Sequence, residues 1–259
     1  MPELNVKGVR LNYQTFGDAT HPALVLSNSL GTNLSMWKSQ VEFFKKNFYV
    51  ICYDTRGHGA SSTPAGPYTV EQLGQDVIDL LDHLKVEKAS FCGISMGGLV
   101  GQWLAIHKAE RLNKVIVCNT AAKIGQAKAW LERSCVVRET GLKQIAATAA
   151  SRWFTDGFIQ DNPDIIASLS QDLAAGCHLG YASCCEALAA EDLREAIASI
   201  SIPFLVIAGK QDPVTSVEDA QFIVDKVIHS KLFEIDASHI SNIEQYDSFN
   251  KTIFNFLRA

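Results

Sequence analysis

Residues 93–98, with the sequence GISMGG, place a serine where it could act as a nucleophile. Ser95 lies in a Gly-x-Ser-x-Gly pattern, between a strand predicted over residues 89–92 and a helix predicted to begin near Met96. In this strand–turn–helix arrangement the serine backbone is strained, and side chains two positions before and after it would collide. The turn lifts the hydroxyl clear of the sheet. It also points the Met96 N–H, at a helix start, toward a developing oxyanion.

A serine nucleophile needs a general base, and the base needs an acid that orients it. His239 follows a strand predicted over residues 231–235, and Asp212 follows one predicted over residues 203–208. Both loops come after the carboxyl ends of strands, where an open α/β sheet places its ligands. The chain order serine, acid, histidine also accompanies this serine motif. We therefore predict a triad of Ser95, His239 and Asp212.

Other candidates for these roles fit less well. Asp236 is the main alternative acid, but it lies three residues before the histidine and we expect it to face solvent. Asn119 ends the preceding strand and carries an amide, not a carboxylate. His58 lies in a glycine-rich loop, where we expect a structural hydrogen bond. The loop after the first buried strand should supply a second oxyanion donor, which we assign to the Leu30 N–H.

The elements that must position these residues alternate between apolar runs and helical patterns. Amphipathic helices are predicted over residues 70–84 and 246–257, and strands over residues 9–16, 23–27, 49–53, 89–92, 112–118, 203–208 and 231–235. Strands that are apolar throughout and separated by helices indicate a mostly parallel sheet with helices on both faces. The predicted fold class is therefore α/β.

Residues 122–198 interrupt this alternation. The stretch is rich in alanine and contains no obvious strand. It also divides by charge, because residues 122–153 carry a net charge of +4 and residues 154–196 a net charge of −7. We predict a helical cap over residues 122–198, inserted into a core made of residues 1–121 and 199–259.

Composition excludes several classes of protein. The 259 residues are 47% hydrophobic and 20% charged, unlike a disordered chain, a collagen or a coiled coil. The net charge of −5 argues against a nucleic-acid partner. The longest uncharged stretch, residues 89–107, is interrupted by glycines, so we expect no membrane span.

The first four residues, MPEL, do not resemble a signal peptide, and the seven cysteines include no Cys-x-x-Cys pair. We therefore predict a cytoplasmic protein with buried free thiols and no metal site.

Several segments resemble the α/β-hydrolase family and, within it, the 3-oxoadipate enol-lactonases of bacterial aromatic-compound catabolism. The segments GHG and SMGG, within residues 53–59 and 91–98, occur in many α/β hydrolases. Three others are more particular to the lactonases: NSLG within residues 27–32, NTAA within 118–122, and YASCC within 180–185. Together with SHISNIE at residues 238–244, the matching segments cover most of the chain.

This resemblance implies an α/β-hydrolase fold and hydrolysis of 3-oxoadipate enol-lactone to 3-oxoadipate, without a cofactor. The substrate would be a small anionic lactone whose free carboxylate needs a cationic partner. The basic half of the cap supplies candidates. Trp130 and Arg133 are three residues apart and share a helix face, so we name them as substrate-binding residues. Arg138 and Arg152 are the less favoured alternatives.

Other functions remain open on the same residues. A general carboxylesterase or a cofactor-free perhydrolase of the haloperoxidase type would use the same triad, and would prefer short neutral esters. A dehalogenase is disfavoured because it needs a carboxylate in place of Ser95. Outside the enzymes, a ligand receptor on this fold would keep the triad and turn over slowly. The sequence predicts no oligomeric state.

Overall fold

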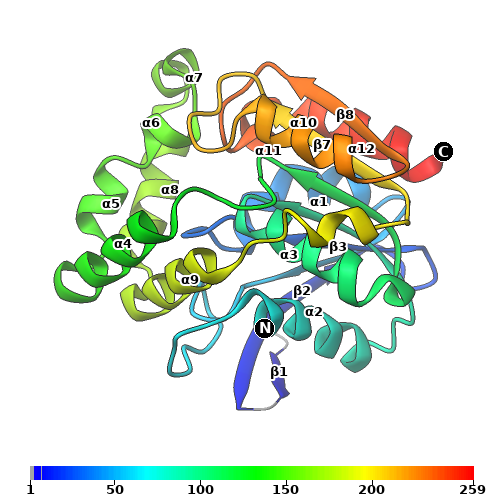
Figure 1. Cartoon of the computed structure of the whole chain (residues 1–259), viewed down its shortest axis with the longest axis horizontal. Helices are drawn as coiled ribbons and strands as arrows, with labels where there is room; N and C mark the ends of the chain where they lie inside the picture. The colour runs from blue at the N-terminus through cyan, green and yellow to red at the C-terminus, as the bar shows by residue number, and fades with distance from the viewer. Residues whose placement is uncertain (1–2, 7) are drawn as a thin grey trace.

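An eight-stranded sheet forms the centre of the computed structural model, which describes residues 3–6 and 8–259 (Figure 1). The strand order is β1-β2-β4-β3-β5-β6-β7-β8. β2 runs antiparallel to its neighbours β1 and β4, and every other pair is parallel. The strands are β1 (Glu3–Val6), β2 (Val9–Phe16), β3 (Ala23–Ser27), β4 (Tyr49–Tyr53), β5 (Ala89–Ile94), β6 (Leu112–Cys118), β7 (Phe204–Gly209) and β8 (Ser230–Ile235).

The sequence pattern finds the buried strands better than the edge of the sheet. Every residue of β3, β5 and β7 is buried, in accord with their apolar sequences and with cover on both faces. Strand β1 was not predicted, because it has four residues and only one of them is buried. Residues 1, 2 and 7 lie outside the described residues. The prediction about a signal peptide used the first four residues, MPEL, and two of these four are therefore not described.

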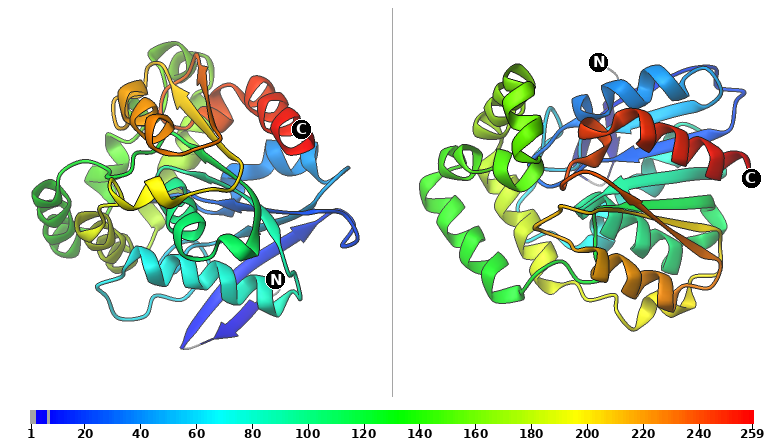
Figure 2. Two further views of the ribbon diagram at one scale, coloured as in Figure 1. Left: turned by 45° about the vertical axis from the view of Figure 1, so that its right-hand side comes forward. Right: turned by 90° about the horizontal axis from the view of Figure 1, so that it is seen from above.

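Helices cover both faces of the sheet, as predicted. Figure 2 shows α1 and α12 on one face and α2, α3 and α10 on the other. A capping box begins α2, in which the Thr69 hydroxyl accepts from the Gln72 N–H and the Gln72 side chain accepts from the Thr69 N–H, each at 3.1 Å. The core helices are η1 (Leu34–Trp37), α1 (Lys38–Phe44), α2 (Val70–His83), α3 (Met96–His107), η2 (Ala109–Arg111), η3 (Ala196–Ser199), α10 (Val217–Lys226), α11 (Ser241–Glu244) and α12 (Tyr246–Arg258).

Six further helices lie in the chain between β6 and η3, and they form a layer at one end of the sheet (Figures 1 and 2). The cap boundary predicted at 121/122 falls in the segment between β6 and the first of these helices. The boundary predicted at 198/199 falls within η3. The cap helices are α4 (Ala127–Thr140), α5 (Lys143–Ala147), α6 (Ala150–Trp153), α7 (Asp156–Asp161), α8 (Pro163–Ala175) and α9 (His178–Ala190).

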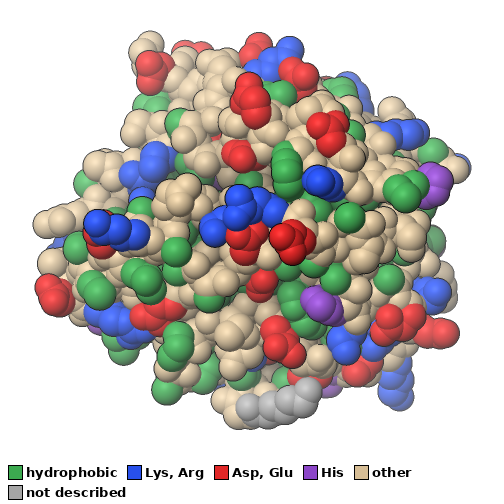
Figure 3. Space-filling model, viewed as in Figure 1, with side chains coloured by type: hydrophobic (Ala, Val, Ile, Leu, Met, Phe, Trp, Pro, Cys, Tyr) green, Lys and Arg blue, Asp and Glu red, His purple; other side chains and the backbone are tan. Residues whose placement is uncertain are grey.

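The surface carries charges of both signs, and the cysteines are free thiols. Basic and acidic side chains are interspersed over the face seen in Figure 3. All seven cysteines are unpaired, but the prediction that they are buried is wrong for Cys135 and Cys177, which are exposed on or beside cap helices. In residues 3–6 and 8–259, none of the helices has both the length and the apolar character needed to cross a membrane.

Candidate active site

Ser95 lies in a tight turn between β5 and α3, at the carboxyl end of the sheet. Its backbone φ of 55° is strained for a residue other than glycine, and its N–H donates to the Cys118 carbonyl at 2.9 Å. A Cβ on Gly93 would lie 2.2 Å from the Gly97 oxygen, and a Cβ on Gly97 would lie 2.4 Å from the Ser27 oxygen. The two flanking glycines are therefore required by close backbone contacts, as the motif predicts.

Asp212 and His239 meet at the ends of β7 and β8. The His239 Nδ1 lies 2.8 Å from the Asp212 Oδ2, and both side chains are buried. Asp212 also accepts from the Thr215 hydroxyl at 2.8 Å and from the Val214 N–H at 2.8 Å. Burial raises the pKa of Asp212, but the hydrogen bond and charge of His239 and the other donors outweigh it, so the pKa lies below its usual value. This carboxylate is suited to hold His239 in one tautomer.

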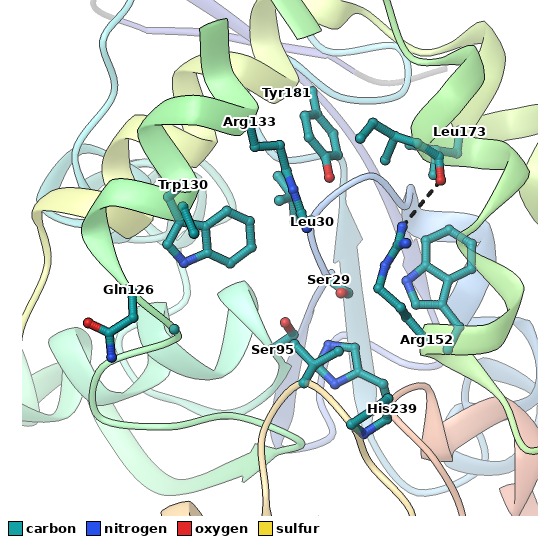
Figure 4. Close-up of a pocket in the computed structure, with 16 residues that line it drawn as sticks. Ser29, Leu30, Ser95, Gln126, Trp130, Arg133, Arg152, Leu173, Tyr181 and His239 are labelled. Carbon is teal, nitrogen blue, oxygen red and sulfur yellow. Dashed lines mark hydrogen bonds between the residues drawn. The ribbon is translucent and has the colours of Figure 1, made fainter. Parts of the chain in front are cut away.

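Ser95 and His239 line the same cavity and lie side by side at its floor (Figure 4). No hydrogen bond joins the Ser95 hydroxyl to the His239 ring in this structure. Catalytic hydrogen bonds often form only once substrate is bound. Nor does the Leu30 or the Met96 N–H donate to another described residue, so both groups are available to an oxyanion.

The cavity has a volume of about 290 Å³ and lies between the sheet and the cap. Trp130 and Arg133, the predicted substrate-binding residues, line it together with Ser95, Leu30 and His239 (Figure 4). The Arg133 guanidinium lies over the Trp130 ring, 4.8 Å from its centre, as expected for residues that share a helix face. The structure therefore brings together residues from the core and from the cap.

The structure distinguishes between Arg138 and Arg152, the two less favoured candidates for binding the substrate carboxylate. Arg152, one of the two less favoured, also lines the cavity. Burial and the nearby charge of Arg133 hold the pKa of Arg152 below its usual value. Burial also raises the pKa of Tyr181 to about 12, although Arg133 and Arg152 both oppose this shift. Arg138 instead forms a salt bridge with Glu186 at 2.9 Å and does not line the cavity.

Two residues near the triad were given no catalytic role by the sequence. Asn119 Nδ2 donates to Asp212 Oδ2 at 3.1 Å and to the Ser238 oxygen at 3.0 Å, and the Ser241 hydroxyl donates to Asn119 Oδ1 at 2.5 Å. Asn119 follows β6 as Ser95 follows β5, so the strand-end rule that found the triad could have found it. The other residue is His58, whose Nε2 accepts from the Gly31 N–H at 3.0 Å. His58 therefore makes the structural hydrogen bond expected of it.

The site has the layout of a serine hydrolase: a strained serine after a strand, a buried histidine–carboxylate pair and two free backbone N–H groups. Within the described residues, no group of three His, Cys, Asp or Glu side chains is placed to bind a metal ion. The family model of the alpha/beta hydrolase fold matches residues 22–246. The chain therefore belongs to the α/β-hydrolase family.

Within this family, the resemblance to the enol-lactonases is confirmed by similar proteins. The chain is 63% identical to 3-oxoadipate enol-lactonase 2 of Acinetobacter baylyi, over 96% of this chain and 94% of that one. It is 44% identical to 3-oxoadipate enol-lactonase 1 of the same organism, over 98% and 96% of the two chains. The crystal structure of the enol-lactonase from Burkholderia xenovorans LB400 matches with a TM-score of 0.98 and 43% identity, over 100% of both chains.

Proposed function

We propose that the protein hydrolyses 3-oxoadipate enol-lactone to 3-oxoadipate, a step in bacterial catabolism of aromatic compounds. The observation that carries this proposal is the cavity in which Ser95 and His239 share one space with Arg133 and Arg152. The serine and histidine fit the lactone carbonyl, and the arginines fit the carboxylate of the same molecule. The identity of 63% to an enol-lactonase supports this choice of substrate.

In the first half-reaction Ser95 Oγ attacks the ring carbonyl carbon while His239 takes the hydroxyl proton. Asp212 holds the imidazole tautomer and stabilises the imidazolium through the Nδ1 contact of 2.8 Å. The Leu30 and Met96 N–H groups bind the oxyanion. The bond between the carbonyl carbon and the ring oxygen then breaks. The released enolate takes the proton from the His239 imidazolium and becomes the ketone, so His239 is neutral again and the acyl-enzyme is a 3-oxoadipyl ester of Ser95.

In the second half-reaction water replaces the enolate. His239 takes a proton from the water molecule as its oxygen attacks the acyl carbon, and then returns a proton to Ser95 Oγ as that bond breaks. The product leaves as a dicarboxylate. An enolate is a better leaving group than an alkoxide, so the acylation step needs little acid assistance.

The proposal is tested by following loss of the lactone in the presence of purified protein and identifying 3-oxoadipate as the product. Ser95→Ala should abolish turnover, since it removes the nucleophile. Arg133→Ala should raise KM more than it lowers kcat, because the carboxylate it binds takes no part in bond breaking. A wild-type enzyme that hydrolyses short neutral p-nitrophenyl esters much faster than the lactone would contradict the proposal. If Arg133→Ala left lactone turnover unchanged, the role of Arg133 as carboxylate ligand would be wrong.

A further inference from the structure

The lining of the active-site cavity carries two positive charges and no negative one. Arg133 and Arg152 are among its sixteen lining residues, all of them in the described part of the chain, and none of the sixteen is Asp or Glu. Most other walls are apolar and include Leu30, Ile145, Trp153 and Leu173. Such a cavity suits a ligand with an apolar middle and an anionic end.

Neither arginine forms a salt bridge with a carboxylate of residues 3–6 or 8–259. Neutral groups hold them instead. Arg152 Nη1 donates to the Thr148 hydroxyl at 2.8 Å, and its Nη2 donates to the Ile145 oxygen at 3.2 Å. Arg133 packs over the Trp130 ring. These contacts orient the guanidinium groups but do not neutralise them, so an anion that binds between them would relieve the repulsion between the two charges.

We propose a further activity for this site: hydrolysis of monoalkyl esters of six-carbon dicarboxylic acids, in preference to neutral esters of the same length. The proposal rests on the proposed function, because it uses the same nucleophile and the same anion subsite. The acyl-enzyme formed from a monoalkyl adipate has the same number of carbon atoms as the one formed from the lactone. It differs only in a methylene group where the lactone product has its ketone. The free carboxylate therefore reaches the same arginines.

The reaction balances without any co-reactant other than water. Ser95 Oγ forms a bond to the ester carbonyl carbon, His239 takes the serine proton and passes it to the alkoxide, and the alcohol leaves. Water then adds to the acyl carbon, the bond to Ser95 breaks, and the dicarboxylate is released with one proton. A neutral ester of equal length would place a methyl group beside the two guanidinium groups and desolvate them without a partner.

The experiment compares monomethyl adipate with methyl hexanoate, in which a methyl group replaces the free carboxylate. In the wild-type protein we expect kcat/KM for monomethyl adipate to exceed that for methyl hexanoate by about 100-fold, the worth of one charge-assisted hydrogen-bond pair. Arg133→Ala and Arg152→Ala should each lower this ratio, the double variant should bring it close to one, and Arg133→Lys should keep part of it. Lys128→Ala is the matched control. Lys128 lies on α4 like Arg133, but its side chain is 87% exposed and does not line the cavity.

A wild-type ratio close to one would overturn the proposal. So would an equal loss of activity on both esters in the arginine variants, which would mean that the arginines only support the fold. Assays on the enol-lactone run in parallel separate this proposal from the proposed function. Turnover of the lactone without turnover of monomethyl adipate would refute only the ester activity. Turnover of monomethyl adipate, with the expected ratio but without turnover of the lactone, would support the ester activity and refute the lactonase function.

Discussion

Replacing His58 by leucine should impair catalysis although His58 does not reach the nucleophile. Its Nε2 accepts a hydrogen bond of 3.0 Å from the Gly31 N–H, within the oxyanion loop (residues 28–32). Because Nε2 is the acceptor, the ring proton lies on Nδ1, 3.4 Å from the Arg56 oxygen. Gly31 directly follows Leu30, the proposed oxyanion donor. His58 therefore fixes the peptide plane next to that donor.

The magnitude follows from the contacts that remain. Leucine leaves the Gly31 N–H without an acceptor, which would cost about 1–3 kcal/mol at a fully buried donor and costs less at this partly buried one. Elsewhere the loop keeps the hydrogen bond from Asn28 Nδ2 to the Tyr53 oxygen at 2.9 Å and that from the Thr32 N–H to the Ser29 oxygen at 3.2 Å. We therefore expect the Leu30 donor to be displaced but not lost. Complete loss of one oxyanion donor costs about 10²–10³ in kcat, so His58→Leu should lower kcat by about 10- to 100-fold.

The assay measures kcat and KM on the enol-lactone together with the affinity for a boronic acid, whose oxygen occupies the oxyanion site once boron binds Ser95. His58→Leu should lower kcat and weaken boronate binding, with little change in KM or in product affinity. His58→Gln, which keeps an acceptor for the Gly31 N–H, should recover most of the activity. An unchanged kcat in His58→Leu, or equal damage in both variants, would refute this account.

Three further predictions concern the triad and the cap. Asn119→Leu removes the donor to Asp212 together with the bonds to Ser238 and Ser241, and it should lower kcat by about 10-fold, with circular dichroism used to check that the fold is kept. The pKa of Asp212 is lowered in the folded protein, so its carboxylate stabilises the fold above the usual pKa of 3.8, and this contribution is lost as the pH falls through the folded pKa. Urea titrations of Asp212→Asn against wild type should show a stability difference that shrinks at acid pH, and a constant difference would contradict the shift. A Cβ on Gly180 would lie 2.2 Å from the Gly57 oxygen, so Gly180→Ala should destabilise by about 1–3 kcal/mol, whereas Gly157→Ala, with open space around it, should not.

The fold and the meeting of Ser95, Asp212 and His239 at one edge of the sheet could be predicted because they depend on local patterns. Buried parallel strands are apolar throughout, so β3, β5 and β7 stand out in the sequence. The turn at Ser95 needs glycine at two fixed positions, and strand ends place Asp212 and His239 in loops at the same edge of the sheet. The fold class needs no knowledge of long-range contacts.

The contacts of the cap could not be predicted in the same way. In α4 only Ser134 and Val137 are buried, so its sequence does not show which face turns toward the cavity. Arg152 lies in α6, a helix of four residues, which is too short for any periodicity to indicate a direction. The sequence could therefore identify a basic segment, but not which of its basic side chains line the cavity.

Salt bridges and solvent exposure distinguish the basic side chains of this segment from one another, whereas their spacing in the sequence does not. Of the six basic residues between positions 122 and 153, Lys123, Lys128 and Arg138 form salt bridges within the described chain. Lys143 is exposed to solvent, which screens its charge. The remaining two, Arg133 and Arg152, are half-buried and line the cavity above Ser95. A net charge of −5 is compatible with an anionic substrate, because carboxylates pair with Lys123, Lys128 and Arg138, solvent screens Lys143, and only the two proposed substrate ligands line the cavity without a carboxylate partner among the described residues.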